Sequence, residues 1–121
     1  MKVRIAVQED IKQIEELLNA NKVQTPKEVT DMGLCLVIEG HEGLVLGTVS
    51  VTFGNSTSAY IDYWAIREGN KKAAYELIKG MEIFLRISGI KRYRMVSLNS
   101  ENHESWGAVS HGPLNYITKE L

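Results

Sequence analysis

Hydrophobic and polar positions alternate along the start of the chain and then change to a helical period. The alternation places Val3, Ile5 and Val7 on one face and predicts a short N-terminal strand. Glu9 and Asp10 follow at the point where the amides of a helix N-terminus favour negative charge. An apolar stripe at helical spacing then predicts an amphipathic helix, and its members are Ile11, Ile14, Leu17 and Leu18.

The middle of the chain contains three β-rich runs, which come after a polar segment from residue 19 to residue 33. In the polar segment, Thr25 and Pro26 fit the N-cap and the first position of a short helix. Glycine-containing turns separate the runs, so they predict three successive antiparallel strands. The runs cover residues 34–38, 44–53 and 59–66. One predicted face of the second run carries Val45, Val49, Val51 and Phe53.

The helical period returns between residues 70 and 88 and predicts a second long helix, with Gly89 as its C-terminal cap. The remaining segments predict a strand, a short helix and a weak last strand, at residues 93–98, 102–110 and 114–121. A strand that follows a crossover helix usually lies parallel to its neighbour, so this order of elements predicts a sheet with both parallel and antiparallel pairs. We therefore expect a single α/β domain over residues 1–121, with the mixed sheet of an α+β fold. Its centre is a mixed sheet flanked by helices. Ligands of such sheets bind where neighbouring strands diverge or where a helix N-terminus faces a cleft, which indicates the junction after Ile66.

The composition is that of a globular protein, with 44% hydrophobic and 24% charged residues. A formal net charge of -1 excludes the basic surface of a dedicated nucleic-acid binder. The N-terminus lacks the apolar core of a signal peptide, and no segment has the roughly 18 apolar residues of a membrane span, so we expect a cytoplasmic protein without a membrane partner. Cys35 lies among apolar residues and is expected in the core.

Several stretches follow one another in an order that characterises one enzyme superfamily. Residues 3–18 (VRIAVQEDIKQIEELL) look like its opening strand and helix. The third and fourth strands, the cofactor helix and the fifth strand of that superfamily then have counterparts here in the same order. These are LVLGTVSV with Gly47, AYIDYWAI, a long helix with Leu77 and Ile78, and GIKRYRMVSL. In this layout, more than in invariant residues, nearly the whole chain resembles the GNAT superfamily. The resemblance implies a GNAT-like fold, acetyl-CoA as acyl donor, and an amine acceptor on a small molecule or a protein.

The resemblance also implies which residues bind the cofactor. In the family, main-chain groups at the end of the fourth strand pair with the pantetheine arm of acyl-CoA, and Trp64, Ala65 and Ile66 occupy those positions here. A small-residue loop then meets the pyrophosphate at a helix N-terminus, where aligned amides and the helix dipole replace water around an anion. The corresponding residues are Gly69, Asn70, Lys71, Lys72, Ala73 and Ala74, and Asn102 matches a family asparagine near the cofactor.

This loop departs from the family pattern in two ways. Its spacing differs by one or two residues, and Glu68 stands where it would repel a phosphate. The alternative interpretation is a helix that begins after a Gly–Asn turn, with lysines exposed in its first turn. Asn102 likewise fits a helix-capping run.

Acyl transfer to an amine needs a group that accepts the amine proton and benefits from an acid near the leaving thiolate. By resemblance, Asp62 on the fourth strand is the candidate base, with a solvated carboxylate on an open sheet face as the alternative. The C-terminal tyrosine of the family has no aligned counterpart, so Tyr116, or His111 in its place, is the candidate acid. His41, His103 and His111 lack the helical spacing of a metal site, and we expect none.

A second interpretation remains open, in which the chain is a GNAT-like domain that has lost catalysis and works as a binding or regulatory module. Exposed Trp64 or Trp106 would then anchor an interface, since tryptophans are frequent hot spots. Homodimerisation through the C-terminal strands is compatible with both interpretations. A basic cluster of Lys91, Arg92 and Arg94 indicates either a solvated strand edge or a contact for a phosphate or an acidic partner.

Overall fold

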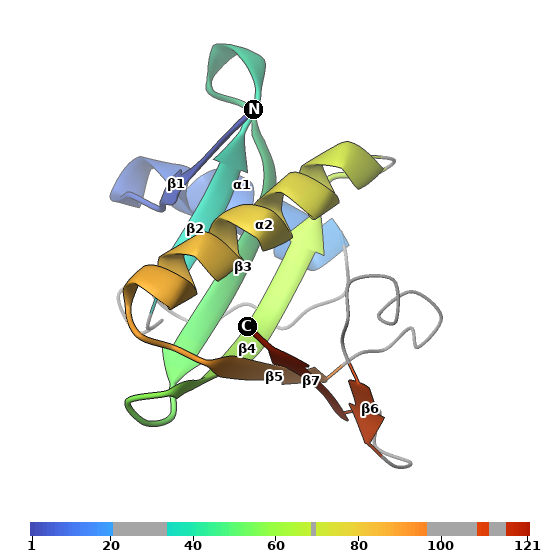
Figure 1. Cartoon of the computed structure of the whole chain (residues 1–121). Coiled ribbons are helices and arrows are strands. Elements are labelled where there is room, and N and C mark those ends of the chain that lie inside the picture. The colour runs from blue at the N-terminus through green and yellow to red at the C-terminus, as the bar shows by residue number, and fades with distance from the viewer. Residues whose placement is uncertain (21–33, 69, 97–108, 112–115) are drawn as a thin grey trace.

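The computed structural model describes residues 1–20, 34–68, 70–96, 109–111 and 116–121 of the 121-residue chain (Figure 1). Within them, seven strands form one sheet in the order β1-β2-β3-β4-β5-β7-β6. The pair β4–β5 is parallel, as predicted for the crossover, and the other neighbouring pairs are antiparallel. The strands are β1 (Lys2–Ile5), β2 (Leu34–Glu39), β3 (Val45–Phe53), β4 (Ser58–Ile66), β5 (Arg92–Val96), β6 (Val109–His111) and β7 (Tyr116–Glu120). The α-helices are α1 (Ile11–Ala20), which continues a 3-10 turn at Gln8–Asp10, and α2 (Lys71–Ile87); a further 3-10 turn at His41–Gly43 joins β2 to β3.

The two helices cover opposite faces of the sheet, as the buried residues of β2 show. Leu36 and Ile38 pack in one cluster with the apolar side of α2, whereas Cys35 and Val37 pack in another with the apolar side of α1. Successive side chains of a strand point to opposite faces, so each helix covers one face. In Figure 1, α2 crosses in front of β2, β3 and β4, and α1 lies behind them. We call the two sides of the sheet the α2 face and the α1 face.

Asp10 fixes the beginning of α1 through its side chain. The residue is 4% exposed, and its Oδ2 accepts a hydrogen bond of 2.8 Å from the main-chain N–H of Val7, at the start of the helix. Arg4 donates to both Asp10 oxygens, at 2.7 and 2.9 Å, and to Glu39 Oε2 at 2.8 Å. These bonds join β1, the start of α1 and β2, and the Arg4 guanidinium holds the pKa of Asp10 below its usual value.

α2 has a clear cap at each end. Asn70 Oδ1 accepts a hydrogen bond of 3.0 Å from the Ala73 N–H, and Gly89, beyond the C-terminus, takes a left-handed φ of 83° that favours glycine. Gly80 lets the helix approach β1 closely, because a Cβ there would lie 2.7 Å from Val3 side-chain atoms. The buried stripe is Ala73, Leu77, Met81 and Leu85.

A bulge in β3 changes the face on which its first residue lies. The register with β2 shifts between Val45 and Gly47, so Val45 packs with α1, whereas Val49 and Val51 pack under α2. The predicted common face for these valines is therefore wrong at Val45. Phe53, expected on the same face, is exposed at the end of β3.

A second bulge lies in the middle of β4. The register with β3 shifts between Ser50 and Val51, so that Asp62 is the additional residue of β4. Ile61 and Trp64 consequently both pack on the α2 face, although a regular strand would send residues three apart to opposite faces.

β4 and β5 separate next to this bulge. Their parallel pairing ends at Ile61 and Met95, after which β5 stops at Val96 and β4 continues to Ile66. Among the described residues, the part of β4 beyond Asp62 pairs with β3 alone. We call the place where the two strands part the β4–β5 fork.

Three further predictions need correction. Val109–His111 forms β6, so the helix predicted for residues 102–110 is wrong at its C-terminal end, because pairing with β7 decides so short a segment. The N-terminal strand ends at Ile5, which is 54% exposed because β1 is an edge strand, and Val7, which is 51% exposed, lies beyond it as the N-cap of the 3-10 turn. The basic cluster on β5 does not lie at a sheet edge, because β5 runs between β4 and β7. Residues 102–108 and the helix predicted at Thr25 and Pro26 lie outside the described residues.

Candidate functional site

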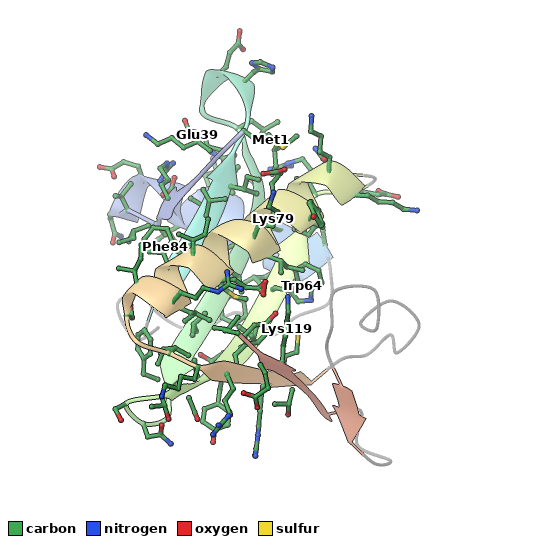
Figure 2. The ribbon with its side chains drawn as sticks, in the orientation of Figure 1. Met1, Glu39, Trp64, Lys79, Phe84 and Lys119 are labelled. Atoms are coloured by element: carbon green, nitrogen blue, oxygen red, sulfur yellow. The ribbon has the colours of Figure 1, made fainter. Side chains whose placement is uncertain are left out.

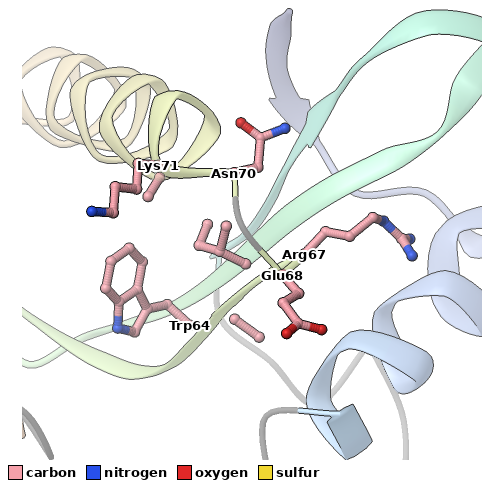
Figure 3. A pocket seen from close by; sticks show the side chains of 8 residues that line it. Trp64, Arg67, Glu68, Asn70 and Lys71 are labelled. Atoms are coloured by element: carbon pink, nitrogen blue, oxygen red, sulfur yellow. The ribbon is translucent and has the colours of Figure 1, made fainter.

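A hollow of about 440 Å³ lies where β4 ends and α2 begins (Figure 3). This is the junction after Ile66 that the order of elements indicated. Its volume lies in the range of about 300–1,000 Å³ that is usual for small-molecule sites. The lining residues are Trp64, Ala65, Ile66, Arg67, Glu68, Asn70, Lys71 and Ala74.

The main-chain groups of Trp64 and Ile66 point away from β3. The Arg67 N–H donates to the Leu46 carbonyl at 2.7 Å, which directs the main chain of Arg67 toward β3. Because main-chain groups of successive strand residues point to alternate sides, Ala65 also faces β3, whereas Trp64 and Ile66 face the side of the β4–β5 fork. A strand end in this orientation can pair with an extended ligand through its main chain.

The N-terminus of α2 borders the same hollow. Lys71, the first residue of the helix, lines it together with Trp64, and Figure 3 shows the two side chains beside the same space. The first-turn amides and the helix dipole give this end a partial positive charge that attracts anions. Asn70 uses one of these amides, because its side chain accepts from Ala73 N–H.

Two charged residues of the connecting loop limit this attraction. The Arg67 guanidinium donates to the Val45 carbonyl from Nε at 3.1 Å and from Nη2 at 2.8 Å, and in Figure 3 it extends away from Trp64 and Lys71. Glu68 is exposed and lines the hollow, where its carboxylate offsets the charge of Lys71. The role of Arg67 as a clamp between loop and β3 was not predicted, since the sequence shows only an arginine after a strand.

Asp62 lies at the β4–β5 fork and does not line the hollow. It is exposed, and its Oδ2 accepts a hydrogen bond of 2.5 Å from Thr52 Oγ1 on β3. Only Tyr63 separates it along β4 from Trp64, which does line the hollow. The candidate base and the candidate cofactor hollow are therefore neighbours on one strand.

Two other predicted cofactor residues lie outside the lining of the hollow. Lys72 is exposed and Ala73 is buried in the core under α2, and neither lines the hollow. Ala73 contributes to the site only through its amide, which Asn70 caps. Gly69 and Asn102 lie outside the described residues.

The main chain of Tyr116 starts β7 beside the end of β5. Its Cα pairs with Val96 on one side and with His111 of β6 on the other. Val96 is also where β5 ends beyond the fork. Tyr116 thus comes from β7, which is next to β5, and His111 comes from β6, one strand further away, while the candidate base comes from β4.

Burial changes the acidity of two groups near this part of the sheet. Cys35 is in the core, as predicted, and burial raises the pKa of its thiol, which keeps it protonated and poorly nucleophilic at neutral pH. Burial is also the main cause that raises the pKa of Tyr63, the residue after Asp62. Its phenol therefore stays protonated in the physiological range.

Neither helix in the described part of the chain combines the length and apolar character needed to cross a membrane. The same residues contain no group of three or more His, Cys, Asp and Glu side chains that could hold a metal ion.

In sequence, no protein-family model matches this chain, and no curated protein matches it. In structure, it is similar to N-acetylglutamate synthase from Neisseria gonorrhoeae complexed with coenzyme A and L-arginine, with a TM-score of 0.79 and 17% identity over 99% of this chain. The chain spans about a third of the length of that protein, 33%.

Two further similar structures are closer to this chain in length. One is a GNAT family N-acetyltransferase from Escherichia coli in complex with CoA, with a TM-score of 0.76 and 15% identity over 98% of this chain and 80% of that one. The other is a GNAT family acetyltransferase from Brucella melitensis in complex with acetyl-CoA, with a TM-score of 0.75 and 16% identity over 99% and 87%. At such identities the likeness shows the fold, and the predicted mixed-sheet architecture is confirmed.

Proposed function

We propose that this chain, which has the GNAT fold, is an N-acetyltransferase that transfers an acetyl group from acetyl-CoA to an amine. The observation that carries the proposal is the hollow at the end of β4, which adjoins both the N-terminus of α2 and the β4–β5 fork. The similar Escherichia coli and Brucella proteins were solved with CoA and with acetyl-CoA, which supports a CoA-type ligand in this fold.

The residues of the hollow suit the two ends of such a ligand differently. The main-chain groups of Trp64 fit an extended amide-containing arm, as β-strand pairing requires no particular side chain. The N-terminus of α2 and Lys71 attract phosphates, whereas Glu68 opposes them. We therefore infer moderate affinity, with the arm contributing more than the phosphates.

In the proposed reaction, acetyl-CoA supplies a thioester carbonyl carbon, to which the amine nitrogen bonds as the C–S bond breaks. Asp62 takes up the proton that the amine nitrogen loses, either directly or through water. Thr52 donates to Oδ2 of this carboxylate and so orients it, which leaves Oδ1 to accept the proton. Tyr116 is the proposed source of the proton that the leaving thiolate takes up, on the basis of its place beside the end of β5.

The test of the base is Asp62→Asn, with Glu16→Gln on the exposed side of α1 as the matched loss of a carboxylate. We expect Asp62→Asn to lower kcat by about 10²–10⁴-fold with little change in the affinity for acetyl-CoA, and to remove the limb of the pH–rate profile that belongs to the base. Glu16→Gln should leave both unchanged. An Asp62→Asn enzyme with the wild-type kcat and pH profile would reject the assignment.

A second candidate function is a CoA-binding or protein-binding module without catalysis. Three described features favour it: Glu68 in the hollow, the Ala73 amide already capped by Asn70, and the guanidinium of Arg67 committed to β3. Thiol release from acetyl-CoA in the presence of a panel of amines separates the two functions. Turnover supports the acetyltransferase, and binding of acetyl-CoA without turnover on any amine supports the module.

A further inference from the structure

One part of the α1 face is covered by α1, and another part carries exposed polar side chains. On β5, Tyr93 and Met95 are buried in the core under α2, so the alternating residues Arg92 and Arg94 point to the α1 face. Both arginines are exposed. Within the described chain, the apolar side of α1 packs against the first residues of β3 and the last residues of β4, through Val45 and Ala65, and not on β5.

The strand register aligns these arginines with polar residues of the neighbouring strands. Arg94 pairs with Tyr60 of β4 and with Thr118 of β7, and Tyr60 in turn pairs with Thr52 of β3. Side chains of directly paired residues share a face, so the four form one row across the sheet. Asp62 is bound to Thr52 at the end of this row and lies next to the fork.

Some charged side chains of this part of the α1 face form ion pairs with each other, and others do not. Arg92 forms an ion pair with Glu120, Nε to Oε1 at 3.2 Å, and is thereby neutralised. Arg94 makes no ion pair with any residue that the structure describes, and Asp62 bonds to a hydroxyl rather than to a cation. Among the described residues of this face, Arg94 is therefore a positive charge and Asp62 a negative charge without an ion-pair partner.

We infer that this row binds the acceptor, and that the acceptor is an amine of amino-acid size that also carries a carboxylate. This inference rests on the proposed function for the identity of the reaction. Asp62 meets the amine next to the fork, and Arg94 holds the carboxylate with its planar fork of N–H donors, a geometry that matches carboxylate in two parallel hydrogen bonds. One free guanidinium balances a single negative charge, which favours a carboxylate over a phosphate dianion.

The arrangement separates donor and acceptor by the sheet itself. The hollow is bordered by α2, which covers the α2 face, whereas the Arg94 row lies on the α1 face. The pairing of β4 with β5, which separates the two faces in this part of the sheet, ends at Ile61 and Met95. Asp62 is the first residue of β4 after that last pair, so the acceptor amine meets the acyl group at the fork.

Matched pairs of amines, with and without a carboxylate, test the inference. The probes are phenylalanine with phenethylamine, lysine with cadaverine, and O-phosphoethanolamine as the phosphate-bearing amine. Amide chemical shifts of the ¹⁵N-labelled full chain report binding without any turnover. We expect the carboxylated members to shift the amides of Tyr60, Arg94 and Thr118, and the plain amines to shift them much less.

In the turnover assay, KM should be about tenfold lower for the carboxylated member of a pair, the size of one charge-assisted interaction. Arg94→Gln should abolish this difference while leaving KM for the plain amines unchanged, and Arg94→Lys should keep part of it. Arg86→Gln removes an exposed arginine on α2 and should preserve the wild-type preference.

Equal shifts and equal KM values for both members of each pair would overturn the inference while leaving the acetyltransferase proposal intact. Wild-type discrimination in Arg94→Gln, or tighter binding of O-phosphoethanolamine than of the amino acids, would overturn the assignment of Arg94 to a carboxylate. If acetyl-CoA is not turned over with any amine, the proposed function fails. The chemical-shift comparison then still shows whether the Arg94 row binds a carboxylate.

Discussion

Asn70 illustrates how one side chain controls two properties at the entrance to the hollow. By accepting from Ala73 N–H it stabilises the start of α2, an effect of about 1 kcal/mol for such caps. The same hydrogen bond removes an amide that could otherwise bind a phosphate. The sequence indicated a helix start at this asparagine, but it could not show which of the two uses the side chain has, because the answer depends on a rotamer.

Glu68 and Lys71 should change the affinity for acetyl-CoA in opposite directions. Glu68→Gln removes a negative charge from the lining of the hollow and should tighten binding about two- to fivefold at low salt, whereas Lys71→Gln should weaken it about three- to tenfold. Calorimetric titration of acetyl-CoA measures both, and both effects should shrink as salt is added. Lys79→Gln, on the same helix but outside the lining, is the control.

A loss of affinity in Glu68→Gln, or equal losses in Lys71→Gln and Lys79→Gln, would show that the phosphates do not bind beside this loop.

Asp10 should stabilise the fold in a pH-dependent way. Its pKa is lowered in the folded chain, chiefly by the hydrogen bonds from Arg4, so its contribution is complete above the unfolded pKa of about 3.9 and is lost as the pH falls through the folded value. Asp10→Asn should lower the free energy of unfolding by about 1.5–3 kcal/mol at neutral pH, the range for hydrogen bonds to charged groups. Urea unfolding at several pH values measures the difference.

The difference between wild type and Asp10→Asn should shrink below about pH 4, where the wild-type carboxyl becomes protonated. A difference that stays constant down to about pH 2 would mean that the charge of Asp10 is irrelevant. Glu15→Gln, an exposed change on α1, should behave as wild type throughout.

At the scale of elements, long periodic segments were predictable and short or irregular ones were not. The strands of the central meander and α2 appear within a few residues of their predicted bounds, because each has enough residues to display its period. The bulges at Leu46 and Asp62 were not predictable, since an additional residue is visible only against the register of the partner strand. The bulge in β4 nevertheless decides that Asp62 lies at the β4–β5 fork.

A buried ion pair joins α2 to β7 and should be costly to break. Lys119 Nζ lies 2.7 and 2.6 Å from the two oxygens of Glu82, which is 6% exposed. Lys119 pairs with Tyr93 and so shares the α2 face with it, and Figure 2 labels it at the sheet beside α2. Lys119→Ala leaves the Glu82 charge buried without this partner. We expect the free energy of unfolding to fall by about 3–5 kcal/mol, measured by urea denaturation.

Two further variants make this prediction specific to the buried charge. Glu82→Leu combined with Lys119→Met should regain most of the lost stability, because apolar replacements of a buried pair are often neutral. Arg92→Gln breaks an exposed ion pair and should cost less than about 1 kcal/mol. Equal losses for Lys119→Ala and Arg92→Gln would contradict the account.

At the scale of the whole molecule, the order of elements predicted the sheet and the position of the hollow without any matching sequence family. The fold places a helix N-terminus and a diverging strand pair together because a parallel crossover must return α2 over the sheet. What the order of elements could not supply is the charge around the hollow, which depends on single side chains such as Arg67 and Glu68.

The proposed acetyltransferase function requires that acetyl-CoA bind in the hollow beside Trp64. The chain has two tryptophans, so Trp106→Phe leaves Trp64 as the sole indole reporter, and titration of that variant with acetyl-CoA observes the hollow directly. We expect a saturable change in Trp64 emission with a half-point between about 1 μM and 1 mM, the usual range for enzyme substrates. Emission that stays unchanged, or changes only linearly, up to several times the upper end of that range would contradict it.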